Sequence, residues 1–428
     1  MEYKKINNEN FDIHLINSNR FKTSNIVIFF SKKYNRKDNA LSSLLIKNMV
    51  YTSKKYNTKN KMAIAGENLY GARVSSSFNV IGNVQSIVFS LDYLNHKYTD
   101  KSYLKKSLEF LYEILFNPNV ENNGFKEEYF NIIKNDTISS FKSIKDNPNL
   151  FASIEYNKLM YKGTQSEYGT LPTLKDIENV TPENLFEYYK KLFTDYRIDV
   201  VVNSDIDDEK ELVSVINEVF SKFRSTKEEF DLIINHKYSE EVITKKDTLE
   251  FNQSKLYMGF RLDNMDYHEI NHVLKLYNTI LGTMNDSILF NIVREKNSLC
   301  YSIGSYFSRF NPSLTIHAGI NKVNYEKSVE LIKECMELMK DKKSLERLFE
   351  SAKKTLNTFL NNYYDDVTSQ VNRYYYGQFY DCEDIEEHRE NINKVTIDEI
   401  IKINNKIHLN TIYLLEGDNN GKKDIWDC

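Results

Sequence analysis

The sequence predicts an α+β fold made of two homologous domains, each with a mostly antiparallel sheet and helices packed on one face. Three observations lead to this prediction. The 428 residues are more than one ordinary core holds. Hydrophobic residues make up 41% of the chain, which is ample for globular packing. One order of strand-like and helix-like segments occurs twice, in halves of about 210 residues, which indicates an internal duplication.

In the first half, an apolar run predicts a buried strand at 25–30, and leucines at helical spacing predict a helix from about Asp38. Asp146-Asn147-Pro148 ends a later helix, because the residue before a proline avoids the helical conformation. The other elements follow in order. We expect strands at 72–80, 85–94 and 198–203, and helices at 104–115, at 126–143, from about 149, from 181 and at 208–223.

The second half repeats this order after a charged segment of weak periodicity, residues 227–246, which we interpret as a linker. We therefore predict domains at 1–226 and 247–428. The expected strands are 256–262, 301–308, 313–320 and 410–415, and the expected helices are 267–281, 326–339, 345–364, 366–376 and one from 396.

Composition and charge argue against several classes of function. The net charge of -4 gives no reason to expect nucleic acid or an anionic membrane as a partner. The sequence has no signal-peptide core and no run of about 18 apolar residues, so we expect a cytoplasmic chain. No Cys-x-x-Cys spacing predicts a disulfide framework or a structural zinc ion. The cysteines are Cys300, Cys335, Cys382 and Cys428.

Arg294 and Tyr301 are the first candidate site residues. They flank a predicted junction between a strand and a helix that Asp286 or Ser287 caps, and both polar heads are expected to face one cleft. A guanidinium offers forked donors to a peptide carbonyl or a carboxylate, and a phenol adds a donor near a developing oxyanion. The alternative is that Arg294 only pairs with a nearby acid and that Tyr301 packs in its strand.

The motif His268-Glu269-x-x-His272 is a second candidate site, on a predicted helix. In such a motif the two histidines bind zinc and the glutamate acts as general base. A third ligand is commonly a glutamate about 20 residues later, whereas position 292 is Ile. Solvated residues at a helix start are therefore the competing interpretation of the motif.

The repeated order and three segments make the chain resemble the insulinase-like (pitrilysin, M16) metallopeptidases, and most of all the bacterial group with two of the family's domains per chain. The resemblance covers nearly the whole chain. Its most specific segment is the last of the three, because an Arg-Glu pair followed at this spacing by Leu-x-Tyr is rarely reached by chance. The segments are 69–76, 107–118 and 282–302.

The resemblance also implies where a zinc site would lie. Active members carry His-x-x-Glu-His on the first helix of the first domain and a glutamate ligand on a later helix. Matching the apolar spacing places Leu44 and Asn48 at the histidines, Lys47 at the base, Ser140 at the glutamate ligand and Ile133 at a supporting acid. Leucine cannot ligate zinc, asparagine is a weak ligand and an ammonium repels the metal. We expect no metal on this chain.

In that family, the residues matching Arg294 and Tyr301 reach the substrate backbone at the zinc site of the first half. The resemblance therefore implies a subunit that is inactive alone, which closes the chamber of a heterodimeric peptidase and holds the peptide. A homologous partner would supply zinc and the general base. Residues 298–302 would set a strand edge to which a peptide can add. The alternatives are a zinc peptidase acting through the His-Glu-x-x-His motif and a peptide-binding scaffold without catalysis.

Overall fold

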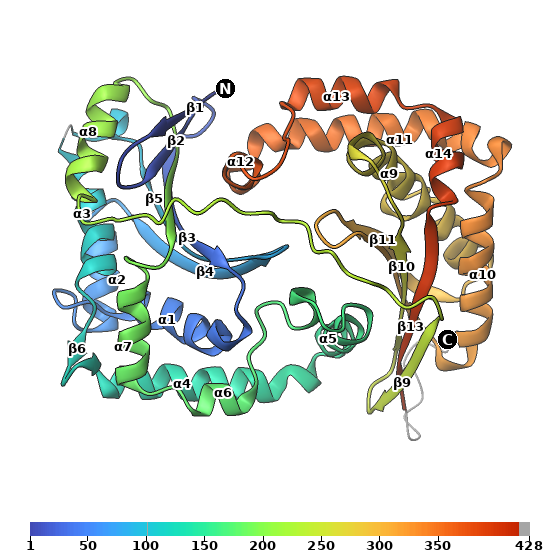
Figure 1. Cartoon of the computed structure of the whole chain (residues 1–428), viewed down its shortest axis with the longest axis horizontal. Coiled ribbons are helices and arrows are strands. Elements are labelled where there is room, and N and C mark those ends of the chain that lie inside the picture. Colours follow the sequence, from blue (N-terminus) through green and yellow to red (C-terminus); the bar gives the residue numbers. More distant parts are fainter. Residues whose placement is uncertain (101, 419–428) are drawn as a thin grey trace. The chain divides into compact units, whose positions relative to one another are not determined.

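The computed structural model describes residues 1–100 and 102–418 and confirms the α+β fold, with two compact units that each contain one large sheet (Figure 1). Unit 1 comprises Met1–Lys142, Tyr168–Leu232 and Tyr363–Cys382. Unit 2 comprises Ser143–Glu167, Ile233–Asn362 and the chain from Glu383 onward. One boundary between the units, after Leu232, lies inside the segment 227–246.

The two sheets share one topology. In unit 1 the strands are β1 (Glu2–Asn7), β2 (Asp12–Asn17), β3 (Thr23–Lys33), β4 (Arg73–Ile81), β5 (Val84–Leu94) and β8 (Arg197–Ser204). In unit 2 they are β9 (Ile243–Leu249), β10 (Ser254–Leu262), β11 (Cys300–Ser308), β12 (Ser313–Ile320) and β13 (Ile407–Gly417). A separate ribbon pairs β6 (Val120–Glu121) with β7 (Gly124–Phe125).

The strand orders show the duplication directly. Unit 1 has the order β1-β2-β8-β3-β5-β4, and unit 2 has β11-β12-β10-β13-β9. Starting from β4 and from β11, five strands correspond one to one, and β1 is an addition to the first copy. Among the described residues, β2 with β8 and β9 with β13 are the parallel pairs, at equivalent places in the two sheets. This agreement confirms that the two domains are homologous repeats.

Helices of both units follow the repeated order. The principal helices of unit 1 are α1 (Asn39–Tyr51), α2 (Lys59–Glu67), α3 (Tyr103–Phe116), α4 (Glu127–Lys142), α6 (Leu174–Glu178), α7 (Pro182–Lys191), α8 (Glu209–Val219) and α12 (Val367–Gly377). Those of unit 2 are α5 (Pro148–Met160), α9 (Leu274–Asn278), α10 (Tyr325–Leu338), α11 (Lys342–Asn362), α13 (Ile385–Lys394) and α14 (Ile397–Asn404). Three π-helical turns of unit 2 are η5 (Glu269–Val273), η6 (Thr279–Thr283) and η7 (Phe290–Lys296).

Several elements differ from the sequence prediction. The helix expected at 267–281 is present, but it is not a regular α-helix, because η5 and η6 wind π turns on either side of α9. Apolar spacing cannot reveal the extra residue that each such turn admits. The sequence analysis also missed β1, β2, β9, α2 and α13. The strand β1 reads Glu-Tyr-Lys-Lys-Ile-Asn and lies at a sheet edge, so it has no apolar pattern to detect.

One face of each sheet packs against helices of its own sequence half. In unit 1, α1, α3, α7 and α8 lie along this face (Figure 1). Alternate residues of β3, Ile26, Ile28 and Phe30, point into this core and are fully buried. Leu44 and Leu45 of α1 meet them there. Burying a leucine contributes about 1.5–3 kcal/mol, so this layer holds α1 firmly on the sheet.

The second face of each sheet is covered by a helix from the other half of the sequence. The helix α12 packs in unit 1, where the ring centroids of Tyr375 and Phe29 are 3.7 Å apart and the Tyr375 hydroxyl donates to Ser31 Oγ at 2.6 Å. The helix α5 packs in unit 2, where the hydroxyls of Tyr156 and Thr315 are 2.8 Å apart. Because α5 follows α4 as α12 follows α11, the two copies exchange equivalent helices.

A glycine allows α5 to approach its sheet closely. A Cβ atom on Gly259 of β10 would lie 2.4 Å from Tyr156 Oη and 2.6 Å from Met160 Sδ. The register between β10 and β13 also shifts directly after Gly259. Gly259 is therefore the site both of the close contact with α5 and of the irregular pairing between β10 and β13.

Charged groups are buried together in unit 1. The Arg197 side chain is 1% exposed, and its Nε donates to Asp199 Oδ2 at 2.9 Å while one terminal nitrogen lies 3.1 Å from Asp12 Oδ2. His14 Nε2 is 3.1 Å from the other Asp199 oxygen. Burial acts to raise the pKa of Asp199, but the interactions with His14 and Arg197 outweigh it and hold the pKa below its ordinary value.

No helix among the described residues is both long enough and apolar enough to cross a membrane. Cys300 and Cys335, which lie within these residues, are free thiols. Cys428 lies outside the described residues.

We expect Gly259→Ala to lower the free energy of unfolding by about 1–3 kcal/mol, because the added methyl group forces α5 away from β10. Urea unfolding followed by circular dichroism measures this loss. The same substitution in a Met160→Ala background should cost less, since the shorter side chain makes room for the methyl group. An equal loss in both backgrounds would contradict the proposed contact.

We expect Asp199→Asn to lower the free energy of unfolding at pH 7 by about 3–5 kcal/mol, because it breaks a buried ion pair. A lowered folded-state pKa stabilises the chain above the unfolded pKa of about 3.9, and this contribution is lost as the pH falls through the folded value. Below pH of about 4, the unfolding free energy of the native chain should therefore fall more steeply than that of the variant. Unfolding curves across this range test this, with exposed Asp195→Asn as control; parallel pH profiles would refute it.

Candidate functional site

The α1 positions matched to the zinc motif carry no zinc ligands. Leu44 is fully buried in the core of unit 1. Asn48 Nδ2 donates to the Leu44 carbonyl of its own helix at 2.8 Å. Lys47 Nζ donates to Thr137 Oγ1 of α4 at 2.8 Å. Burial lowers the pKa of Lys47, and Asp136 acts weakly in the opposite direction.

The residue of α4 that meets Lys47 is Thr137, which the sequence analysis did not single out. Its hydroxyl also donates to the carbonyl of Ile133, a buried core residue, at 2.8 Å. Ser140 lies about one turn later, is exposed, and donates to the carbonyl of Asp136 at 2.8 Å. Zinc sites in proteins use imidazole, thiolate and carboxylate ligands. The side chains at the positions matched to zinc ligands, and Thr137 beside them, do not fit a zinc ion.

In unit 2, the chain reverses its direction directly after η7, and this turn places Arg294 beside Tyr301. Ser298, just after η7, has φ +51°, and its N–H donates to the Arg294 carbonyl at 2.9 Å. The Leu299 N–H donates to the Val293 carbonyl at 3.1 Å. The chain thereby turns back into β11. The guanidinium carbon of Arg294 lies 6.0 Å from the centroid of the Tyr301 ring.

Tyr301 is the extra residue of a β-bulge. Cys300 lies opposite Ile320 and Ser302 lies opposite Gly319, so no residue of β12 faces Tyr301. The bulge turns the side chain outward, and Tyr301 is 79% exposed. The strand β11 is the last in its sheet, so its other edge has no strand partner within the described part of unit 2. Bulges at sheet edges commonly redirect a side chain beside a binding site.

Arg294 is held loosely enough to bind another group. Its side chain is 40% exposed, and its ion pair within the described residues is with Glu295, at 3.8 Å between Nε and Oε1. That distance is beyond a good hydrogen bond, and an exposed pair of this kind contributes about 0–1 kcal/mol. The guanidinium also lies over the Phe290 ring, 4.6 Å from its centroid. This stacking orients the guanidinium and leaves its donors able to bind a carbonyl.

A pocket of about 860 Å³ adjoins Tyr301. Its lining includes Cys300 and four amide side chains, and amides both donate and accept hydrogen bonds, as a peptide backbone does. Burial raises the pKa of the Cys300 thiol to about 11, against a smaller opposite effect of Arg294. Cys300 is thus a protonated thiol near neutral pH and does not supply a nucleophile. The amides belong to Asn252, Gln253, Asn321 and Asn324.

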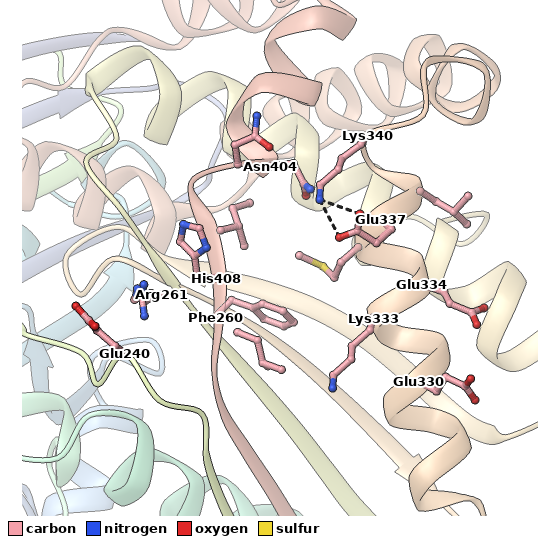
Figure 2. A pocket seen from close by; sticks show the side chains of 15 residues that line it. Glu240, Phe260, Arg261, Glu330, Lys333, Glu334, Glu337, Lys340, Asn404 and His408 are labelled. Carbon is pink, nitrogen blue, oxygen red and sulfur yellow. Dashed lines mark hydrogen bonds and ion pairs between the residues drawn. The ribbon is translucent and has the colours of Figure 1, made fainter.

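A larger pocket of unit 2, about 1070 Å³, is lined by α10 and by residues of β10 and β13 (Figure 2). Figure 2 shows the Lys340 ammonium paired with Glu337, at 2.8 Å. On the strands, Arg261 Nε and His408 Nε2 lie 3.2 and 3.4 Å from the carboxylate of Asp263. These charges pair with near neighbours and do not converge on one point, so we assign no chemistry to this pocket.

The glutamate of the His-Glu-x-x-His motif is bound within the protein. Glu269 pairs with Lys406 at 2.6 Å and accepts a hydrogen bond from the backbone N–H of Asp266 at 2.9 Å. The motif begins at the start of η5, with His268 as the residue before its first turn. A carboxylate that caps a helix and pairs with an ammonium is poorly placed to take a proton from water.

The two histidines of the motif point their Nε2 atoms at different carboxylates. His268 Nε2 lies 2.9 Å from Glu399, and His272 Nε2 lies 2.8 Å from Glu383. The sequence analysis missed Glu383 and also His388, whose Nδ1 lies 3.0 Å from the same Glu383 oxygen. Glu383 is 111 positions from His272, and no local spacing connects residues so far apart.

Comparisons with known proteins give one family match and two relatives in Bacillus subtilis (strain 168). Residues 179–356 match the family model described as Peptidase M16 inactive domain. The probable inactive metalloprotease YmfF of Bacillus subtilis (strain 168) is 26% identical over 417 residues, which cover 94% of this chain and 95% of that protein. The uncharacterized zinc protease YmxG of the same organism is 24% identical over 317 residues, covering 73% and 75%.

A solved structure shows the same fold along almost the whole chain. A conserved protein from Enterococcus faecalis V583 aligns with a TM-score of 0.90 and 24% identity, covering 98% of this chain and 100% of that one. The family match over residues 179–356, the relatives and the duplicated sheets together make this chain similar to M16 peptidases, and its α1 carries Leu44, Lys47 and Asn48 at the positions matched to the zinc motif.

Proposed function

We propose that this chain is the non-catalytic subunit of a two-subunit M16 zinc peptidase. It closes the chamber and holds the peptide backbone, and a homologous partner supplies the zinc ion and the general base. The observation that carries the proposal is the exposed pair of Arg294 and Tyr301, built at a helix end and a bulge. The same chain has Leu44, Lys47 and Asn48 on α1, where an active member has ligands and base.

The chemistry of the pair suits a peptide under attack at its carbonyl carbon. The Arg294 guanidinium offers forked donors to a substrate carbonyl. The Tyr301 phenol adds a donor, and donors aimed at developing negative charge stabilise the transition state. The open edge of β11 can receive an extended peptide through backbone hydrogen bonds. The amide-lined pocket beside Tyr301 can bind further backbone groups of the peptide.

The relatives support a division of labour between two chains. One relative is named a probable inactive metalloprotease and another a zinc protease, and both are found in Bacillus subtilis (strain 168). A chain without the ligands and a homologue with zinc would together form one complete site. We place this assembly in the cytoplasm, and the free thiols of Cys300 and Cys335 suit its reducing conditions.

We expect Arg294→Ala to lower kcat/KM of the reconstituted complex by about 10- to 150-fold, the loss of one hydrogen bond from a charged donor. The complex is formed from this chain and a homologue that carries an intact His-x-x-Glu-His motif, and cleavage of a fluorogenic peptide is followed. Arg294→Lys should recover only part of the rate, since an ammonium lacks the planar fork.

Arg347→Ala, on the exposed side of α11, is the matched control and should leave turnover unchanged. Size-exclusion chromatography should show the same complex for all three variants. Unchanged turnover in Arg294→Ala, with the complex intact, would remove Arg294 from the mechanism. Peptide cleavage by this chain alone would show that it does not depend on a partner.

We expect Ser298→Gly to raise the free energy of unfolding by about 1 kcal/mol, because glycine adopts the left-handed conformation of this residue without the strain of a side chain. Ser298→Val should lower it and should also slow the complex, since the turn sets Tyr301 beside Arg294. Ser302→Gly is the control, because glycine inside a strand should destabilise. Urea unfolding measures all three; a destabilised Ser298→Gly would contradict the strain.

A further inference from the structure

Two imidazoles converge on one carboxylate oxygen in unit 2. Glu383 Oε2 lies 2.8 Å from His272 Nε2 and 3.0 Å from His388 Nδ1. One ligand atom from each residue lies within 4.8 Å of the others, and no second group of three such residues occurs in the described part of the chain. The side chains of His272 and His388 are 2% and 5% exposed. Two imidazoles and a carboxylate are a ligand set that zinc uses.

The carboxylate is oriented from its other side. Asn391 Nδ2 of α13 donates to Glu383 Oε1 at 3.0 Å, so that Oε2 faces the two rings. Further from the carboxylate, the Nδ1 atoms of His272 and His268 are 3.2 Å apart, and His268 Nε2 lies 2.9 Å from Glu399 Oε1. These groups therefore form a continuous hydrogen-bonded network from Glu399 to His388.

The contact between the two imidazoles is compatible with a metal ion on His272. The Nδ1 atoms of His268 and His272 are at hydrogen-bond distance, so one of them carries the shared proton. A metal ion on His272 Nε2 would place that proton on His272. The ring proton of His272 then sits on Nδ1 and is donated to His268, which donates from Nε2 to Glu399. Metal-bound histidines commonly donate their other N–H in this way.

From this arrangement we propose that His272 Nε2, His388 Nδ1 and Glu383 Oε2 bind a divalent transition-metal ion, best matched by Zn²⁺. His268 and Glu399 form the outer hydrogen-bond relay of this site, and Asn391 orients the carboxylate. The ion would join η5 to α13. It departs from the expectation that this chain carries no metal, and it is separate from the peptidase chemistry, because Glu269 is bound to Lys406.

The ammonium group of one lysine competes with the proposed metal ion for the His388 ring. Lys275 Nζ of α9 lies 2.7 Å from His388 Nε2. A ring that binds metal through Nδ1 carries its proton on Nε2, and this N–H cannot accept a hydrogen bond from an ammonium. The ion and the Lys275 contact therefore exclude each other. Lys275→Met keeps the length of the side chain and removes the charge, so the metal should bind this variant more tightly.

The test uses the full chain, purified without a histidine tag and stripped with a chelator. Zn²⁺ is titrated by calorimetry against a competing chelator, and bound metal is counted by atomic emission. We expect one ion per chain, and a loss of at least about 100-fold in affinity for His272→Ala and His388→Ala, each of which removes a ligand. His96→Ala, which removes a histidine paired with Asp207 in unit 1, should bind as the native chain does.

Two milder variants keep the test decisive if the ligand variants fail to fold. His268→Ala should weaken binding by about 10- to 100-fold, as loss of an outer partner does. Lys275→Met should strengthen it by about 10-fold, the effect of removing one competing contact of about 1.4 kcal/mol. Absence of saturable Zn²⁺ binding, or affinity in Lys275→Met and His268→Ala equal to that of the native chain, would overturn the site. The Arg294 experiment is independent of either result.

Discussion

The structure depends on burying both faces of each central sheet. The strand β3 places Ile26, Ile28 and Phe30 against the helices of its own half, and Phe29 on the opposite face is just as fully buried. A helix must therefore cover that second face, and in both units it comes from the other half of the sequence. Aromatic rings such as Phe29 each bury a large apolar area in such a layer. Neither half of the chain can complete its own sheet.

This exchange explains what sequence reasoning could and could not predict about the fold. Strands such as β3, β5 and β8 were predicted because apolar side chains follow one another along them. The helices at α5 and α12 were also predicted, but nothing in their sequences says which sheet they cover. That choice depends on contacts such as Tyr156 with Gly259 and Tyr375 with Phe29, between residues far apart in the chain. Local patterns carry no information about contacts at that separation.

The candidate site was partly predictable for the same reason. Arg294 and Tyr301 lie close in sequence, so one local segment pointed to both, and the relation of Leu44, Lys47 and Asn48 to the zinc motif is also local. The bulge that exposes Tyr301 was not predictable, because it exists only in the pairing of β11 with β12. Thr137 and the His272 partners Glu383 and His388 were missed because helix packing brings them together.

The equivalent helices of the two repeat copies differ in their winding and in the contacts of their polar side chains. In the first copy, α1 is a regular helix on which Leu44 extends the core, Asn48 satisfies its amide on its own turn and Lys47 reaches Thr137. The three positions that the resemblance matches to the zinc motif thus make ordinary contacts within unit 1. In the second copy, the corresponding helix is wound with the π turns η5 and η6, which are rare and often mark functional sites.

Local strain in the second copy is concentrated where its polar groups are exposed. The left-handed Ser298, the π turn η7 and the bulge at Tyr301 occupy one short segment, and a non-glycine residue in such a conformation costs about 1–3 kcal/mol. Packing of the Tyr301 side chain does not offset this cost, because that side chain is 79% exposed. Strain that persists without a packing gain is expected at a binding surface, where a ligand provides the missing contacts. Both proposals, the peptide contact at Arg294 and Tyr301 and the metal site at His272, therefore fall in the second copy, whereas the matched positions Leu44 and Asn48 of the first copy are buried.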